Sequence, residues 1–210
     1  ALVATVVPWN TEATASHAEA IVAQWRAQQR EVRRLHERIF YRPLLSAVAR
    51  LSDLGLGTRA RSVVGVGAPD TVVPDDIVVA CVEVLRHWTW EQRPAAVVAM
   101  PSRTRPRLIA SLARRIGEVG RLPVIGSLGY AHGGPTGAPG SGNSAFRLAA
   151  VWDRIVVPAQ VSTALAELGP SPVLLVDDMC DSRWTMTVAA RELRRAGAYS
   201  VLPLVVGVAA

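Results

Sequence analysis

Short hydrophobic segments alternate with helical patterns along the second half of the chain. The hydrophobic runs cover residues 95–100, 122–125, 172–176 and 201–206. Apolar residues at helical spacing follow the first run at Leu108, Leu112 and Ile116, and a further helical pattern covers residues 185–196. Continuous hydrophobic strands that are separated by helices are typical of a parallel sheet with both faces covered. The pattern therefore predicts an α/β fold, in which helices flank a parallel sheet.

The first part of the chain has a different pattern. Residues 14–51 carry a partial apolar stripe at helical spacing, with Arg and Gln between the apolar positions. We therefore predict a helical N-terminal appendage over residues 1–51. Residues 52–73 are rich in Gly and are predicted to form a linker. A helix is expected to start near Pro74, which places the α/β domain at residues 74–210.

Composition narrows the classes of protein to which the chain can belong. It has 210 residues, of which 50% are hydrophobic, and this is enough for one packed domain with an appendage. No apolar run approaches the roughly 18–20 residues that a transmembrane helix needs, so we expect no integral membrane protein. The first residues, ALVATVVPWN, include no basic signal-peptide region and no initiator Met. We expect them to be the cut end of a fragment.

Two residue types bear on chemistry and location. Cys81 and Cys180 are the two cysteines, too few for a four-ligand zinc site, and they favour a reducing cytoplasm. The sequence contains no Lys, which excludes the lysine-dependent phosphate loop of ATPases. The net charge of +6 is compatible with phosphate ligands but is spread along the chain.

The segment with the clearest chemistry is residues 172–187, PVLLVDDMCDSRWTMT. A buried strand leads to Asp177 and Asp178, which we expect at the carboxyl end, where open parallel sheets bind ligands. A short polar loop then enters a helix, whose N–H groups can donate to a phosphate together with the hydroxyls of Ser182 and Thr185. Carboxylates can accept hydrogen bonds from a sugar diol. The segment therefore predicts a site for ribose 5-phosphate.

A second interpretation of the same residues needs no ligand. Asp177 and Asp178 can be solvated residues at the end of a strand, and Asp181 can cap the helix that follows. The phosphate-loop spacing favours the ligand site over this interpretation.

The segment resembles the signature of type I phosphoribosyltransferases, in which an apolar strand and two acids precede a loop of the D-T-G-x-T type. The resemblance implies that Asp177 and Asp178 face the ribose hydroxyls. It further implies a 5′-phosphate loop, formed by Asp181, Ser182, Arg183, Trp184 and Thr185. In purine-salvage members the acid equivalent to Asp181 also lies beside the purine ring, which makes Asp181 the candidate catalytic residue. The implied ligand is phosphoribosyl pyrophosphate or a nucleotide, with Mg²⁺ bound through the pyrophosphate rather than by dedicated protein ligands.

The loop departs from that signature at one position. Arg183 replaces the usual Gly, and Trp184 follows it. Gly is found there because the backbone approaches phosphate closely or adopts a positive φ. Arg183 either supplies charge to the anion or crowds the site, and both alternatives remain open.

A second polar turn follows the run at residues 95–100. In the resembled family this turn holds pyrophosphate, and Ser102 and Arg103 are the candidates for that role. The alternative is a simple strand-to-helix turn with surface arginines. Arg103, Arg105 and Arg107 can equally contact a nucleic-acid backbone.

A Gly-rich stretch over residues 129–142 lies where the family has a mobile catalytic hood. A loop that excludes water during catalysis is one interpretation, and a disordered insertion is the other. Arg147, just after the stretch, is the candidate functional residue of this region.

Residues 52–206 are more specifically similar to the C-terminal region of actinobacterial RecQ-family ATP-dependent DNA helicases. The similarity includes the string VLLVDDMCDSRWTMTVAARELRRAGA and the segments LGLG, VPDD, PSR and GNS. It implies a phosphoribosyltransferase-like domain of such a helicase, without its motor. Residues 20–51 instead resemble a helical segment of bacterial glutamine synthetase adenylyltransferases, which suggests a joined coding sequence.

Three functional hypotheses follow. The first is a domain that binds phosphoribosyl pyrophosphate or a nucleotide, whose reaction would be displacement of pyrophosphate from ribose C1 by a nitrogen nucleophile. The second is a non-catalytic accessory module that binds DNA or a partner through exposed arginines, Arg183 among them. The third is a stable domain that retains no ligand.

Overall fold

The computed structural model describes residues 30, 46–131, 144–181 and 183–209. Most of the predicted helical appendage lies outside these residues, as do Ser182 and most of the Gly-rich stretch.

The centre of the molecule is a parallel sheet of five strands in the order β1-β7-β6-β2-β3. The strands are β1 (Ser46–Arg50), β2 (Ala96–Ala99), β3 (Val124–Ser127), β6 (Pro172–Cys180) and β7 (Ser200–Val208). A small antiparallel pair is formed by β4 (Gly129–Tyr130) and β5 (Ile155–Val156). The four hydrophobic runs identified in the sequence correspond to β2, β3, β6 and β7. The predicted α/β fold with a parallel sheet is thus confirmed.

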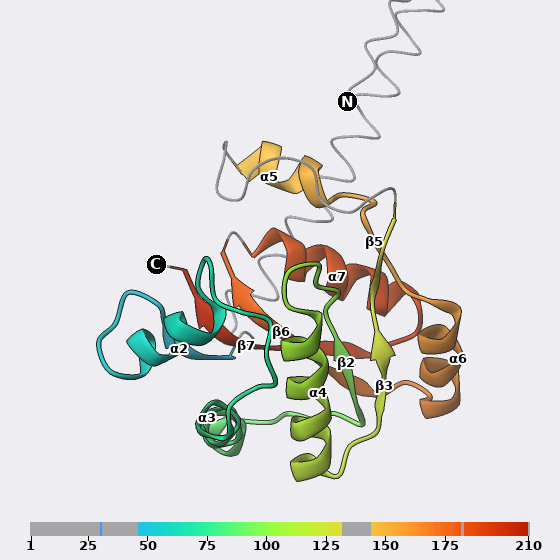
Figure 1. The fold of residues 1–210 in the computed structure, drawn as a ribbon. Helices are drawn as coiled ribbons and strands as arrows, with labels where there is room; N and C mark the ends of the chain where they lie inside the picture. Colours follow the sequence, from blue (N-terminus) through green and yellow to red (C-terminus); the bar gives the residue numbers. More distant parts are fainter. Residues whose placement is uncertain (1–29, 31–45, 132–143, 182, 210) are drawn as a thin grey trace, which may run out of the picture.

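Helices cover both faces of this sheet (Figure 1). One face carries α2 (Leu56–Val64), α3 (Asp75–His87) and α4 (Pro106–Gly120). The other carries α5 (Ser144–Val151), α6 (Ala159–Leu168) and α7 (Trp184–Arg195). The sheet therefore separates two hydrophobic cores, which is why its strands are hydrophobic at successive positions rather than at alternate ones.

Strand β6 lies in the middle of the sheet, between β2 and β7. Its residues from Pro172 to Asp178 are all buried. Val173 and Leu175 pack into the core under α7, and Leu174 and Val176 pack into the core under α4, as expected from the alternation of side chains along a strand. The two acids of the sequence motif thus lie on a buried, central strand of the sheet.

Two segments differ from the elements expected from the sequence. Residues 46–50, inside the predicted helical range, form β1, which pairs in parallel with β7 at the edge of the sheet. The predicted linker contains α2, whose buried side chains include Ala60 and Val64. A Cβ on Gly57 would lie 2.4 Å from the carbonyl oxygen of Arg50, so Gly at this position allows α2 to start directly against the end of β1. Gly57, one of the glycines that suggested a linker, instead permits close packing.

The rest of the predicted linker is fixed to α4. The Asp70 carboxylate accepts hydrogen bonds from the backbone N–H groups of Arg107 (3.1 Å) and Leu108 (2.9 Å), and so caps this helix from a distant part of the chain. The N–H of Val73 donates to the Ser111 hydroxyl at 2.8 Å. Residues 70–73 therefore belong to the folded structure.

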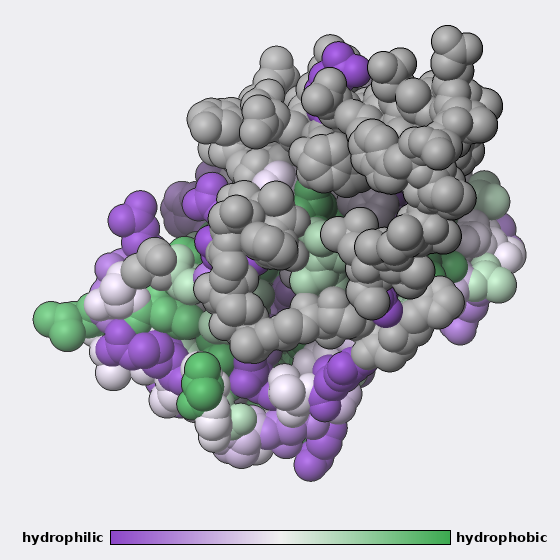
Figure 2. Space-filling model, turned by 90° about the horizontal axis from the view of Figure 1, so that it is seen from above, coloured by the Kyte–Doolittle hydropathy of each residue, from purple (hydrophilic) through white to green (hydrophobic). Residues whose placement is uncertain are grey.

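Exposed hydrophobic side chains gather around α2. They include Leu54 and Val66, which are almost fully exposed, and Leu56. Figure 2 shows this end of the molecule as a green surface at the left. Among the described residues, no helix has the length and the apolar character needed to cross a membrane.

We predict that Asp70→Ala lowers the free energy of unfolding by about 1 kcal/mol, because the first turn of α4 loses its capping acceptor. Asp70→Asn retains one acceptor oxygen, so its loss should be smaller. Urea unfolding of the three proteins provides the measurement. Equal stability of Asp70→Ala and the unmodified protein would show that residues 70–73 do not support α4.

Candidate functional site

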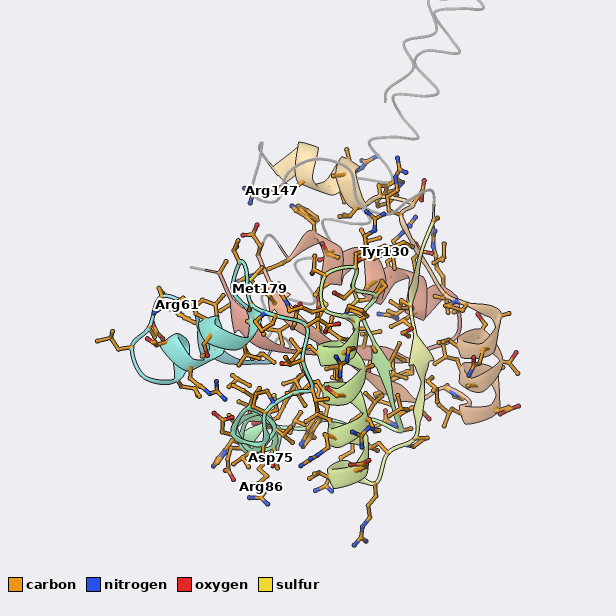
Figure 3. All side chains as sticks on the ribbon, in the orientation of Figure 1. Arg61, Asp75, Arg86, Tyr130, Arg147 and Met179 are labelled. Carbon is orange, nitrogen blue, oxygen red and sulfur yellow. The ribbon has the colours of Figure 1, made fainter. Side chains whose placement is uncertain are left out.

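Three polar segments meet at the carboxyl edge of the sheet. They are the end of β6, the turn from Pro101 to Arg105 after β2, and the loop that enters α7. Because β2 and β6 are parallel neighbours, with Ala99 opposite Val176, their carboxyl ends lie side by side. The N–H of Met100 donates to the carbonyl oxygen of Val176 at 2.8 Å, which brings the turn next to the two acids. In Figure 3, Tyr130 and Met179 lie toward this edge, whereas Asp75 and Arg86 lie on α3 toward the opposite end.

The two acids are buried inside the strand. Asp177 is 8% exposed and Asp178 is 7% exposed, because β6 continues past them to Cys180. The N–H of Asp178 donates to Asp177 Oδ1 at 2.8 Å. The expectation that the strand ends before the acids was therefore wrong, and their burial contradicts the interpretation of them as solvated residues.

Asp178 forms an ion pair with Arg105. Nε of Arg105 lies 2.5 Å from Oδ2 of Asp178, and the two side chains are 11% and 10% exposed. Nη1 of Arg105 also donates to the carbonyl oxygen of Gly65 at 3.2 Å, at the end of α2. A buried carboxylate without a cation is strongly unfavourable, so Arg105 compensates a charge that the fold would otherwise not accommodate. This arginine, one of the candidates for nucleic-acid contact, is thus engaged inside the protein.

Within the described parts of the chain, no cation pairs with Asp177 as Arg105 pairs with Asp178. Burial, and then the neighbouring charge of Asp178, raise the pKa of Asp177 well above the usual range of a carboxyl group, and the more distant charge of Arg105 opposes this only in part. The pair therefore combines two different carboxyl groups. Asp178 is neutralised by a guanidinium, whereas Asp177 holds its proton more tightly than an ordinary carboxyl group, and in its protonated form it can both donate and accept a hydrogen bond.

The turn after β2 brings the two predicted pyrophosphate residues to the same edge. The Ser102 hydroxyl accepts a hydrogen bond from the N–H of Arg105 at 2.9 Å, which orders the turn. Arg103 is exposed, with its guanidinium 5.4 Å from the ring centroid of Tyr130. The structure thus places Ser102 and Arg103 beside the acids.

Tyr130 was not identified from the sequence. Its hydroxyl donates to the carbonyl oxygen of Pro101 at 2.7 Å, and its pKa is raised by burial and by the charge of Asp177. An aromatic residue at the start of a Gly-rich stretch has no specific signature, so only the folded chain shows that Tyr130 lies near the acids.

The loop that enters α7 contains the remaining candidates. Asp181 and Arg183 are exposed, Trp184 and Thr185 are half-buried, and Ser182 lies outside the described residues. Arg183 has φ 66°, the left-handed conformation that Gly adopts readily and that costs another residue roughly 1–2 kcal/mol. Its carbonyl oxygen accepts hydrogen bonds from the N–H and the hydroxyl of Thr187, both at 3.0 Å. Arg183 therefore adopts a backbone conformation that Gly would adopt more readily.

The thiol of Cys180 lies between the acids and this loop. Burial, with a contribution from the charge of Asp177, raises its pKa to about 12. The thiol therefore stays protonated near neutral pH and is unsuited to nucleophilic catalysis.

Helix α5, which follows the Gly-rich stretch, is held against α7. The guanidinium of Arg191 lies 4.1 Å from the ring centroid of Trp152 and pairs with Glu192 at 2.5 Å. Arg147 is half-buried on α5, and its Nε has no hydrogen-bond partner among the described residues. Figure 3 shows Arg147 on α5, beyond the carboxyl edge of the sheet.

No protein-family model and no curated protein matches this chain.

Within the described residues, no group of three or more His, Cys, Asp and Glu side chains is placed to hold a metal ion.

We predict that Asp177→Asn becomes more stable relative to the unmodified protein as the pH rises. The unfolded carboxyl group has a pKa of about 3.9, and the folded state holds the proton more tightly because the pKa of Asp177 is raised. The stability that Asp177 contributes is therefore complete below about pH 4 and is lost as the pH rises through the pKa of the folded state. Asn cannot ionise and retains an oxygen that accepts from the N–H of Asp178.

Urea unfolding from about pH 4 to about pH 8 measures this difference in the free energy of unfolding. A difference that does not change over this range would contradict the raised pKa of Asp177.

Proposed function

We propose that this chain binds a ribose 5-phosphate group, carried by phosphoribosyl pyrophosphate or by a nucleotide, at the carboxyl edge of its parallel sheet. The main supporting observation is that Asp177 and Asp178, buried and adjacent on the central strand, lie beside the turn that contains Ser102 and Arg103. Open parallel sheets bind their ligands at this edge.

In the proposed complex the two carboxyl groups bind the ribose diol. Asp178 accepts hydrogen bonds from the sugar hydroxyls. Asp177, whose pKa is raised by burial, can donate one hydrogen bond to a hydroxyl oxygen and accept another. The difference between the two groups suits a diol, because each hydroxyl is both a donor and an acceptor.

The 5′-phosphate is assigned to the start of α7. The first N–H groups of a helix have no partner within the helix and attract an anion. In our proposal they act together with the hydroxyls of Ser182 and Thr185. The positive φ of Arg183 supports this assignment, because it retains the backbone path that Gly provides in the resembled signature.

The pyrophosphate is assigned to the turn after β2. Ser102 supplies a hydroxyl, and Arg103 supplies an exposed guanidinium. Mg²⁺ would arrive as part of the substrate, bound to the pyrophosphate oxygens, with no resident protein ligands.

The corresponding reaction is phosphoribosyl transfer. A nitrogen nucleophile forms a bond to ribose C1, and the bond from C1 to the pyrophosphate oxygen breaks, so that pyrophosphate leaves with the bonding electrons. Asp181, exposed in the loop before α7, is our candidate to accept the proton of the nucleophile. We further propose that the chain is part of a larger RecQ-type helicase in the cytoplasm, as its ordered resemblance over residues 52–206 suggests.

A second candidate function is binding of DNA or a partner as an accessory module. The exposure of Arg103 and Arg107 favours it, whereas the burial of Arg105 against Asp178 removes one of the arginines on which it relied. Contacts to a phosphate backbone would give an affinity that falls steeply with salt concentration.

Calorimetric titration with phosphoribosyl pyrophosphate and Mg²⁺ tests the first function. We predict micromolar binding to the unmodified protein and a loss of at least about 100-fold in Asp177→Asn/Asp178→Asn, because the charge-assisted hydrogen bond to Asp178 and the hydrogen bonds to Asp177 are all weakened. A second pair of adjacent acids provides a matched control. Asp75 and Asp76 are exposed on α3 at the other end of the molecule, so Asp75→Asn/Asp76→Asn should bind normally (Figure 3).

Circular dichroism establishes that each variant is folded, and Asp177→Asn alone retains the ion pair of Asp178 if the double variant is unstable. Absence of heat at millimolar ligand in the folded, unmodified protein would contradict the proposed function. Binding of an oligonucleotide that weakens steeply with salt, and that is lost in Arg103→Gln/Arg107→Gln, would then favour the accessory module.

A further inference from the structure

Arg105 connects three parts of the carboxyl edge. Its backbone N–H is held by the Ser102 hydroxyl (2.9 Å), its Nε by Asp178 (2.5 Å), and its Nη1 by the carbonyl oxygen of Gly65 (3.2 Å). The remaining Nη2 makes no hydrogen bond within the described residues. Arg105 thus belongs to the turn that we assign to pyrophosphate, and its guanidinium covers Asp178, the carboxylate that we assign to ribose.

The ion pair between Arg105 and Asp178 makes the binding of a neutral sugar less favourable. To reach Asp178, a ribose hydroxyl must replace a charge-assisted hydrogen bond from Arg105 by a weaker neutral donor. Displacement of the guanidinium would also leave two buried acids without a cation, which is strongly unfavourable. Ribose alone supplies nothing that compensates for this loss.

A ligand that carries pyrophosphate compensates for this loss. Its anion offers the guanidinium a partner of the same sign and similar geometry as the carboxylate, and Arg pairs with phosphate through two parallel hydrogen bonds. Arg105 is the last residue of the turn that contains Ser102. A ligand anion bound at this turn would therefore lie on the same side of the site as the Arg105 side chain.

We propose that Arg105 is a movable counter-ion that makes sugar binding at Asp178 conditional on an anion in the same site. Without ligand, Arg105 neutralises Asp178. When pyrophosphate is bound at the turn that contains Ser102, the guanidinium pairs with this anion, and Asp178 accepts hydrogen bonds from the ribose hydroxyls. The site thereby selects ribose that carries pyrophosphate over free ribose. This inference rests on the proposed function and adds the physical reason why the site would discriminate between ligands.

The first test compares the affinities of ribose and of phosphoribosyl pyrophosphate with Mg²⁺ by calorimetry. In Arg105→Gln no cation covers Asp178, so we expect the affinity for free ribose to rise about 10-fold or more, while the affinity for phosphoribosyl pyrophosphate falls. Arg107→Gln is the matched control, because Arg107 is an exposed arginine two positions along the chain. It should change neither affinity. Unchanged ribose affinity in folded Arg105→Gln would mean that Arg105 only contacts the pyrophosphate, and would overturn the proposal.

The second test uses the unmodified protein and therefore does not depend on the folding of a variant. Saturating inorganic pyrophosphate should occupy Arg105 and release Asp178, so ribose should bind about 10-fold more tightly in its presence. Equal affinity for ribose with and without pyrophosphate would overturn the proposal.

The two tests also separate this inference from the function on which it rests. If phosphoribosyl pyrophosphate binds and neither ribose effect is seen, only the role of Arg105 is wrong. If neither ribose 5-phosphate nor phosphoribosyl pyrophosphate binds to the folded protein, the proposed function fails and the role of Arg105 fails with it.

Discussion

The ion pair between Arg105 and Asp178 is the contact on which the carboxyl edge of the sheet depends. It joins the turn after β2 to the central strand β6, and through Gly65 it also holds the end of α2. Two adjacent carboxyl groups on a strand with both faces covered are unfavourable by themselves, because burial and mutual repulsion oppose their ionisation. The structure accommodates them differently. Asp178 has the guanidinium, and Asp177 tends to keep its proton, because burial raises its pKa.

The difference between the two carboxyl groups explains why two buried, adjacent acids are compatible with a stable fold. A surface pair of acids would need no compensation but would offer a ligand weak, water-exposed contacts. A buried pair provides stronger contacts, since charge interactions gain strength away from water. The cost, in our proposal, is that an internal cation occupies one acid until a ligand replaces it. Stability of the ligand-free protein and selectivity of the proposed site therefore depend on the same arginine.

The sequence was sufficient to predict the parallel α/β architecture, because β2, β3, β6 and β7 are uninterrupted hydrophobic runs. It was insufficient for β1, since Ser46–Arg50 is short and rich in Ala and follows a stretch with helical spacing. It was also insufficient for α2, where glycines that permit close contact resemble those of a flexible linker. The clearest example is Gly57, whose missing side chain leaves space for the backbone at Arg50.

In the candidate site, too, the sequence indicated residues that are neighbours along the chain but not contacts between distant residues. The two acids and the loop before α7 are contiguous in the sequence, so their spacing was visible. Arg105 and Asp178 are separated by 73 positions, and no local pattern indicates that they meet. Tyr130 similarly reaches the site through the path of the chain after β3. The replacement of Gly by Arg183 suggested a disturbed loop, yet the structure retains the positive φ at this residue.

The most direct measurement is a nuclear magnetic resonance titration of the isotope-labelled protein with phosphoribosyl pyrophosphate and Mg²⁺, observing the backbone amides and the Nε–H group of Arg105. Our account predicts the largest shifts at Arg105 and in residues 177–185 and 102–105, with little change on α3. It also predicts that free ribose at the same concentration leaves the Nε–H signal unchanged. Shifts confined to other surfaces, or no shifts at all in the folded protein, would contradict a ribose 5-phosphate site at the carboxyl edge of the sheet.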